Sequence, residues 1–196
     1  MKTFLTLLVL LISSWVLAED ISDFEIEGMS IGDSLLDYMS EGEIKTEIDY
    51  IYETDKKFQS KDIASILYDK NLNLYEIIQI DFKTNDTKFE IVSIQGLIFY
   101  ENNIDNCYKK QTIIFENAKR LLGDVHFEKF EPYSHEGYPE GKVILTTFSF
   151  FLDNNKRSNF EIVCWDASKK SNLSNRLSVS LKSHEFNDWM EEIYLN

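Results

Sequence analysis

The hydrophobic positions of this chain change twice from a helical spacing to the two-residue spacing of a strand. After an alternating lead-in over residues 19–29, Ser30 with Asp33 predicts the start of a short amphipathic helix, which we expect Gly42 to end. The apolar residues of that helix recur at helical spacing: Ile31, Leu35, Leu36 and Met39. Four later apolar residues predict a second short helix or an extension of the first: Ile44, Ile48, Ile51 and Tyr52.

Three strands are predicted next, over residues 63–68, 75–82 and 89–100, because apolar and polar residues alternate there. Gly96, in the third of these strands, is expected to form a bulge. The connections between the strands are short. Since a parallel pair needs a crossover of about a dozen residues, these strands are predicted to run antiparallel.

The longest helix is predicted over residues 103–122, where the spacing becomes helical again. Asp105 in its first turn and Lys119 and Arg120 in its last turn suit the helix dipole, and Gly123 suits a left-handed cap. The apolar stripe of this helix consists of Ile104, Cys107, Tyr108, Phe115, Ala118 and Leu122.

A second set of strands is predicted over residues 125–130, 143–152, 159–165 and 176–182, with a turn at 153–156 that makes a hairpin. Ser183 then caps a terminal helix, whose apolar side consists of Phe186, Trp189, Met190 and Ile193. Strands grouped in runs favour an α+β fold. We expect antiparallel sheet packed by a short N-terminal helix, one long central helix and a C-terminal helix, in a single domain of residues 19–196.

The first eighteen residues have the order of a secretory signal peptide. Lys2 supplies a positive start, residues 4–12 are almost wholly apolar, and Val16 to Ala18 suit a cleavage site before Glu19. The apolar run is shorter than the ~20 residues of a spanning helix; the alternative is a buried N-terminal helix. No cysteine follows that run, so we expect Sec export without a lipid anchor, to the periplasm or the extracellular medium, and no membrane span in the mature chain.

Acidic residues outnumber basic ones, 34 against 20, which gives a formal net charge of −14. That sign disfavours a nucleic-acid or anionic-membrane partner, because phosphate groups bind basic surfaces. Residues 19–57 alone carry a net charge of −10. They either attract cations or a basic partner, or form a solvated surface that keeps an exported protein in solution. With 43% hydrophobic and 14% aromatic residues, the chain has the material of a packed core and not of a disordered segment.

His126, Glu128 and His135 lie close together in the sequence, with Glu131 and Glu136 beside them. Imidazole and carboxylate groups bind zinc and similar ions, so these residues form either a metal site or an ordinary polar loop. The sequence has no HExxH helix, no GxSxG turn and no glycine-rich phosphate loop.

The leading hypothesis is therefore an exported soluble module that is not an enzyme and that binds an unknown small ligand or protein partner, in the envelope or outside the cell. The alternative is a metal-assisted hydrolase that uses His126, Glu128 and His135. Under the leading hypothesis we expect no catalytic residue, no metal, no cofactor and no nucleic-acid partner, and the protein is expected to be a monomer.

Cys107 and Cys164 are the two cysteines of the chain. Oxidising compartments favour disulfides, and both residues are predicted on core-facing positions, Cys107 on the long helix and Cys164 in register with Phe160 and Ile162. We expect them to form an intramolecular disulfide. The alternatives are two buried thiols or a bond between two chains.

Three segments, FEIEGMSIGDSLLDYM, SIQGLIFYENNIDNC and SLKSHEFNDWM, resemble an uncharacterised family of small signal-peptide-bearing exported proteins from AT-rich marine bacteria. The resemblance implies export and a shared fold, and it implies no activity. The first segment is also similar to the small outer-membrane assembly lipoproteins of the SmpA type, although this chain lacks their lipobox cysteine. The positions that match the exported family are Gly28, Ser30, Gly32, Asp33, Gly96, Cys107, Phe186 and Trp189.

Overall fold

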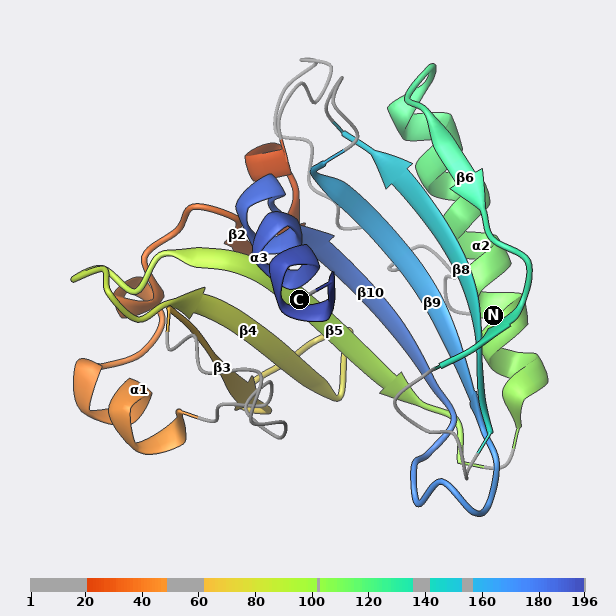
Figure 1. The fold of residues 1–196 in the computed structure, drawn as a ribbon, viewed down its shortest axis with the longest axis horizontal. Coiled ribbons are helices and arrows are strands. Elements are labelled where there is room, and N and C mark those ends of the chain that lie inside the picture. The colour runs from red at the N-terminus through yellow and green to blue at the C-terminus, as the bar shows by residue number, and fades with distance from the viewer. Residues whose placement is uncertain (1–20, 49–61, 102, 136–141, 153–156, 196) are drawn as a thin grey trace, which may run out of the picture.

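The computed structural model describes residues 21–48, 62–101, 103–135, 142–152 and 157–195, and Figure 1 draws the rest as a thin grey trace. The expected signal peptide with its cleavage site at Ala18 and Glu19, the residues Ile51 and Tyr52, and the turn at 153–156 lie outside the described residues. The elements are η1 (Ile21–Asp23), β1 (Glu25–Ile26), β2 (Met29–Ser30), η2 (Leu35–Asp37), α1 (Glu41–Glu47), β3 (Ile63–Tyr68), β4 (Ile77–Lys83), β5 (Ile91–Phe99), α2 (Ile104–Leu122), β6 (Phe127–Lys129), β7 (Tyr133–Ser134), β8 (Val143–Phe151), β9 (Asn159–Ala167), β10 (Arg176–Lys182) and α3 (His184–Leu195), where η marks a 3-10 helix.

Eight of the strands form one antiparallel sheet in the order β3-β4-β5-β10-β9-β8-β6, with β7 also paired to β8. Two meanders, β3-β4-β5 and β8-β9-β10, meet where β5 pairs with β10 along their length. The short strands β1 and β2 form a separate hairpin. The predicted α+β class with antiparallel sheet and three α-helices is confirmed.

One face of the large sheet carries the main hydrophobic core. α2 packs on this face, mostly over β9, and places the buried Phe115 ring 4.7 Å from the Phe148 ring and 5.4 Å from the Phe150 ring. The N-terminal elements share the same core through several buried side chains, among them Ile26, Met29, Leu35 and Ile44. This face is apolar across the strands, because every second residue of each central strand points into the core.

α3 packs on the opposite face of the sheet, where its first two turns contact Ile63 and Val92. In Figure 1, α3 crosses in front of β5 and β10, and α2 lies behind the sheet on the far side. As predicted, Ser183 caps this helix: its Oγ accepts a hydrogen bond from the Phe186 N–H at 3.1 Å. Within the described ranges, α3 covers one end of this face, and the strands themselves form most of the rest.

The predicted helix from Ser30 to Gly42 is wrong. Asp33 does accept a hydrogen bond from the Ser30 N–H at 2.9 Å, but the chain then runs alongside the start of β5, where the Gly32 N–H donates to Ile91 O. Those backbone bonds hold the segment in a turn at Ile31 and Gly32, followed by a bridge from Ser34 to Glu90 and then by the short η2. The capping box lies further on, at Ser40 and Glu43, so Gly42 is inside α1.

The two other glycine predictions also fail. Gly96 pairs regularly with both Ile78 and Val179, and the bulge of β5 lies at its start, opposite Asp81 and Phe82. Gly123 follows α2 with φ +61° and ψ −118°, which is not the left-handed helical cap. The element bounds agree more closely: β3 and β10 begin and end where predicted, and the other predicted strands and α2 differ by one or two residues at an end.

Candidate functional site

The second face of the sheet carries a continuous group of hydrogen-bonding side chains, which we call the polar band. Two neighbouring cross-strand rows supply most of it, and one of these rows runs from Ser65 through Asp81, Ser93 and Lys182 to Asn159. The full band consists of Ser65, Gln79, Asp81, Ser93, Gln95, Ser149, Asn159, Glu161, Ser178, Ser180 and Lys182.

At one end of the band, Asp81 is buried and surrounded by donors. Ser65 Oγ donates to its Oδ1 at 2.6 Å and Gln79 Nε2 donates to the same atom at 3.0 Å. Burial raises the pKa of the Asp81 carboxyl, although hydrogen bonds from Ser65, Gln79 and Ser93 and the charge of Lys182 act in the opposite direction. The carboxyl is therefore held in an environment that favours its neutral form.

In the middle of the band, Lys182 of β10 forms an ion pair with Glu161 of the neighbouring strand β9. Asn159 Nδ2 donates to Glu161 Oε1 at 2.8 Å and lies 3.2 Å from Ser149 Oγ. The side-chain oxygen of Asn159, Oδ1, accepts a hydrogen bond from Asn187 Nδ2 of α3 at 3.1 Å. The network thus extends from the sheet to the helix that covers its end.

The side chains of the band form two levels. The short ones, such as Ser65, Ser149 and Ser178, are buried. The long ones rise above them and stay partly exposed, with 18% of the Glu161 side chain and 26% of the Lys182 side chain accessible to solvent. A molecule that approaches this face therefore meets amide, carboxylate and ammonium groups first and hydroxyl groups beneath them.

Ser180 differs from the other members of the band. Its side chain is on the central strand β10 and only 1% exposed, and its Oγ has no hydrogen-bond partner among the residues that the structure describes. The neighbouring polar groups have other partners: Gln95 Nε2 donates to Ser178 Oγ, and Glu161 accepts from Lys182 and Asn159. The floor of the band therefore contains one hydroxyl whose hydrogen bond is not made within the described residues.

Beyond the band, the same face becomes apolar and aromatic. Val143, Leu145 and Val163 form a small cluster there with Trp165 beside it. The Trp165 ring has Arg176 Cζ 4.1 Å from its centroid and the His135 ring at 5.2 Å. His135 is therefore part of an aromatic stack at this end of the sheet.

The structure does not bring the three residues of the metal hypothesis together. His126 Nε2 lies 3.0 Å from Glu128 Oε1, and the His126 carbonyl accepts a hydrogen bond from the N–H of Phe151, at one end of β8. His135 donates its N–H to the carbonyl of Val143, at the other end. With about 3.3 Å per residue, the two histidines are roughly 26 Å apart along the strand. One ion does not span that distance.

An acidic pocket of about 480 Å³ lies beside α3. Its carboxylates already have partners in several cases: Glu185 lies 2.7 Å from Lys83 Nζ, Asp188 pairs with Arg157, and Asp62 accepts from Asn85 at 2.7 Å. Within the described ranges, no group of three or more histidine, cysteine or acidic residues is arranged to hold a metal ion. The pocket is therefore less suited to a cation than its composition suggests. The carboxylates that line it are Asp62, Asp86, Glu185, Asp188 and Glu192.

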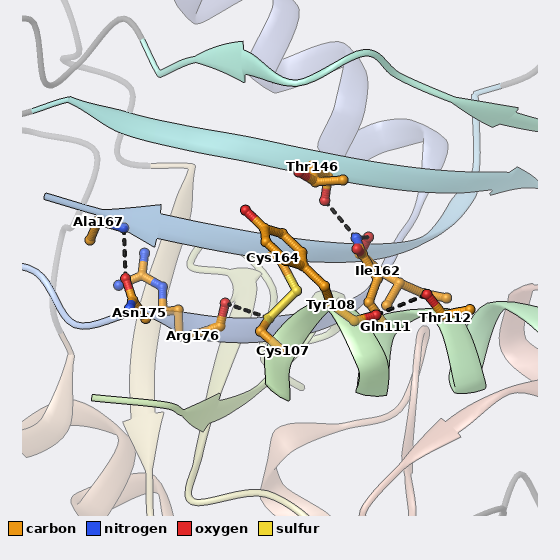
Figure 2. Close-up of a disulfide and its surroundings, with 10 residues drawn as sticks. All are labelled: Cys107, Tyr108, Gln111, Thr112, Thr146, Ile162, Cys164, Ala167, Asn175 and Arg176. Carbon is orange, nitrogen blue, oxygen red and sulfur yellow. Dashed lines mark hydrogen bonds between the residues drawn. A yellow bond between two sulfur atoms is a disulfide. The ribbon is translucent and has the colours of Figure 1, made fainter. Parts of the chain in front are cut away.

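The two cysteines lie behind the band, on the core face. A disulfide joins Cys107 of α2 to Cys164 of β9, with the Cα atoms 6.0 Å apart, and Figure 2 shows it between the helix and the strand. One turn further along α2, the buried Gln111 donates to Thr146 O at 2.6 Å and to Ile162 O at 2.8 Å. These two attachments fix α2 to β8 and β9, so the strands beneath the band are held from behind.

The polar band is not evident from the sequence alone. Its signal was present as polar residues at every second position of four strands, in the pairs Gln79 and Asp81, Ser93 and Gln95, Ser178 and Ser180, and Asn159 and Glu161. Alternation of this kind is typical of any solvated sheet face. Only the strand order shows that the four pairs are neighbours.

Among the described residues, no helix combines the length and the apolar character needed to cross a membrane. In comparisons with known proteins, the chain matches no family model, no curated protein and no solved structure.

Proposed function

We propose that this protein is an exported, non-enzymatic binding module whose ligand or protein partner contacts the polar band. One observation carries the proposal: six neighbouring strands contribute interlocked hydrogen-bonding side chains to one face, while the other face contains the core. A face that only needs to be soluble has no use for such a network, since independent exposed side chains serve equally well.

The character of the band supports binding and not catalysis. Its carboxylates, Asp81 and Glu161, each accept at least two hydrogen bonds from other side chains, so neither is poised to move a proton to or from a bound molecule. The band includes no histidine or cysteine. Export is supported by the signal-like residues 1–18 and by the disulfide, because such bonds persist in oxidising compartments.

Export is tested by expressing the full chain in a bacterium and sequencing the N-terminus of the protein recovered outside the cytoplasm. The expected mature chain starts at Glu19. A Leu8→Arg variant, which interrupts the apolar run, should stay in the cytoplasm with its N-terminus intact. Recovery of an uncleaved wild-type chain from the cytoplasm alone would contradict the proposal.

Binding at the band is tested by NMR, with a chemically diverse set of small molecules that includes sugars, amines, nucleotides and short peptides. The expected result is that amide shifts caused by any binding compound concentrate on β4, β5, β9 and β10. Shifts confined to the acidic pocket beside α3, or the absence of binding by every class, would rule out the band as the site.

A further inference from the structure

Among the described residues, Ser180 is the member of the polar band whose side-chain hydrogen bonding is incomplete. Its hydroxyl is buried on the central strand, and the side chains on both sides of it are committed to other partners. A buried polar atom without a partner is costly and rare in folded proteins. The Ser180 Oγ is covered in the free protein, so a group from outside the chain reaches it only when the partly exposed side chains of its cross-strand neighbours, Gln95 and Glu161, move apart.

The charges around Ser180 are balanced. Glu161 and Lys182 form an ion pair, and the nearest further carboxyl, Asp81, is buried among hydroxyl and amide donors. An anionic ligand would meet two carboxyl groups, and a cationic ligand would compete with Lys182 for Glu161. The local electrostatics therefore favour a neutral ligand, despite the formal net charge of −14 on the whole chain.

The partly exposed groups above Ser180 offer donors and acceptors side by side. The amides of Gln79 and Gln95 each carry both, the carboxylate of Glu161 accepts, and the ammonium group of Lys182 donates. A sugar hydroxyl also donates and accepts, so a ring with several hydroxyls pairs with such a set without burying an unmatched polar group. A peptide segment would instead need apolar pockets for its side chains, and the two rows of the band provide none.

We propose that the polar band binds a neutral polyhydroxylated ligand, a sugar unit of a glycan or a free oligosaccharide, which hydrogen-bonds to the Ser180 hydroxyl between Gln95 and Glu161. This inference rests on the proposed function and adds the chemical class of the ligand. The ligand lies on the face opposite α2, and its hydroxyls complete the network that the side chains leave open at Ser180.

The test uses the mature chain and an immobilised panel of neutral oligosaccharides built from glucose, galactose, mannose and N-acetylglucosamine, with sulfated and uronic-acid oligosaccharides beside them. The expected result is retention on at least one neutral oligosaccharide and weaker retention on the charged ones. Calorimetry with the retained oligosaccharide and with its methyl monosaccharide then distinguishes a glycan chain from a free sugar unit as the ligand.

Two band variants identify the site. Ser180→Ala and Gln95→Ala should each weaken binding about five- to tenfold, because each removes one or two neutral hydrogen bonds. Ser180→Ala should keep or raise the melting temperature, since it removes a buried hydroxyl that has no partner in the free protein. The matched control is Asn106→Ala, which removes an exposed amide from α2 on the other side of the sheet and should leave affinity unchanged.

The outcomes separate the two proposals. If no neutral oligosaccharide binds, or if binding is insensitive to Ser180→Ala and Gln95→Ala, the glycan assignment is wrong. If an amine, a nucleotide or a peptide instead shifts the amides of the band, the assignment is wrong while the proposed binding module stands. If no compound of any class binds to the band, both are wrong.

Discussion

At the scale of single residues, the position of the Tyr75 ring explains why residue 96 is a glycine. A Cβ added to Gly96 would lie 2.6 Å from two carbons of the Tyr75 ring, which is closer than real Cβ contacts. The ring thus covers the glycine on the core face of β5, which is the reason for a glycine in a strand that pairs regularly on both sides.

Gly96→Ala should therefore lower the free energy of unfolding by about 1–3 kcal/mol, the usual cost of overpacking a core. Gly42→Ala is the matched control: nothing lies within 4 Å of the added Cβ in α1, and alanine favours a helix by about 0.5–1 kcal/mol. Urea unfolding measures both. Equal stability of Gly96→Ala and the wild type would show that Tyr75 does not cover this position.

The contribution of Asp81 to the free energy of unfolding is expected to change with pH in a definite direction. Because its pKa is raised by burial, the folded protein holds a proton more tightly than the unfolded chain. The stability that this proton supplies is present at acid pH and is lost as the pH rises from the unfolded pKa through the folded one. Asp81→Asn keeps a neutral group of the same shape and should remove this dependence.

The measurement is the unfolding free energy of the wild type and of Asp81→Asn at several pH values from about 4 to 7. The variant should gain stability relative to the wild type as the pH rises. A difference that moves in the opposite direction would mean that the Lys182 charge and the donors around Asp81 outweigh its burial.

At the scale of elements, Glu27 attaches the N-terminal hairpin to the segment that leads into β4. Glu27 and Gly28 form the two-residue turn with φ of +53° and +81°, and the Glu27 carboxylate accepts the backbone N–H groups of Asn73, Leu74 and Tyr75 at 2.5–3.1 Å. Burial raises the pKa of Glu27, but these hydrogen bonds outweigh it, and the pKa lies below its usual value.

Glu27→Gln should cost about 1 kcal/mol at neutral pH, because a neutral amide oxygen accepts these bonds more weakly than a carboxylate. The lowered pKa means that the contribution is present above the unfolded pKa and is lost as the pH falls through the folded one. The difference between wild type and variant in urea unfolding should therefore shrink in acid. Glu25→Gln, on the exposed side of β1, is the control and should change little at either pH.

The disulfide that attaches α2 to the sheet is expected to contribute strongly to stability. Cys107 and Cys164 are 57 residues apart, and chain entropy for a loop of that length gives about 4 kcal/mol from the disulfide. Cys107→Ser should lower the melting temperature by many degrees, and a reductant should lower that of the wild type to a similar value. A reductant should then have no further effect on the variant. Two free thiols in the oxidised wild type, detected by mass spectrometry, would contradict the disulfide.

How far each element could be predicted depends on what determines it. Residues 176–182 have a strict alternation of Leu177, Val179 and Leu181, and the strand matches its predicted bounds. The N-terminal segment from Ser30 has helical spacing too, but hydrogen bonds to residues at the start of β5, far away in the sequence, override that local preference. Gln111 was missed for a similar reason, since its polar side chain is buried only because two strand carbonyls lie opposite it.

At the scale of the whole molecule, the described part of the sheet has well-protected central strands and edges without a further paired strand. β5 and β10 have a strand on each side, whereas β3 forms one edge, where Leu67 is exposed. In hydrogen exchange, the amides of β5 and β10 should be the slowest to exchange and those of β3 and β6 markedly faster, because edge strands open without global unfolding. Uniform rates over the sheet would mean that it opens only as a unit.

The candidate site is assembled from strands that lie far apart in the sequence, which is why the sequence alone did not locate it. Ser93 and Lys182 lie side by side in the band, yet nearly half of the chain separates them. Alternation assigns each residue to a face of its own strand, but it says nothing about which strands are neighbours. The pairing of β5 with β10 is the information that assembles the band, and no local pattern contains it.

The position of β10 also constrains the order of events in biosynthesis. This strand follows every other strand of the sheet in the sequence, yet it lies between β5 and β9 at the centre of the sheet. Until it emerges, the meander that ends at β5 and the meander that ends at β9 each present an unpaired edge, and pairing over so long a separation in sequence is slow. If the chain is exported N-terminus first, as proposed, it therefore cannot close its sheet until β10 has crossed the membrane. Premature termination before residue 176 would leave two open-edged halves that are prone to associate with other chains.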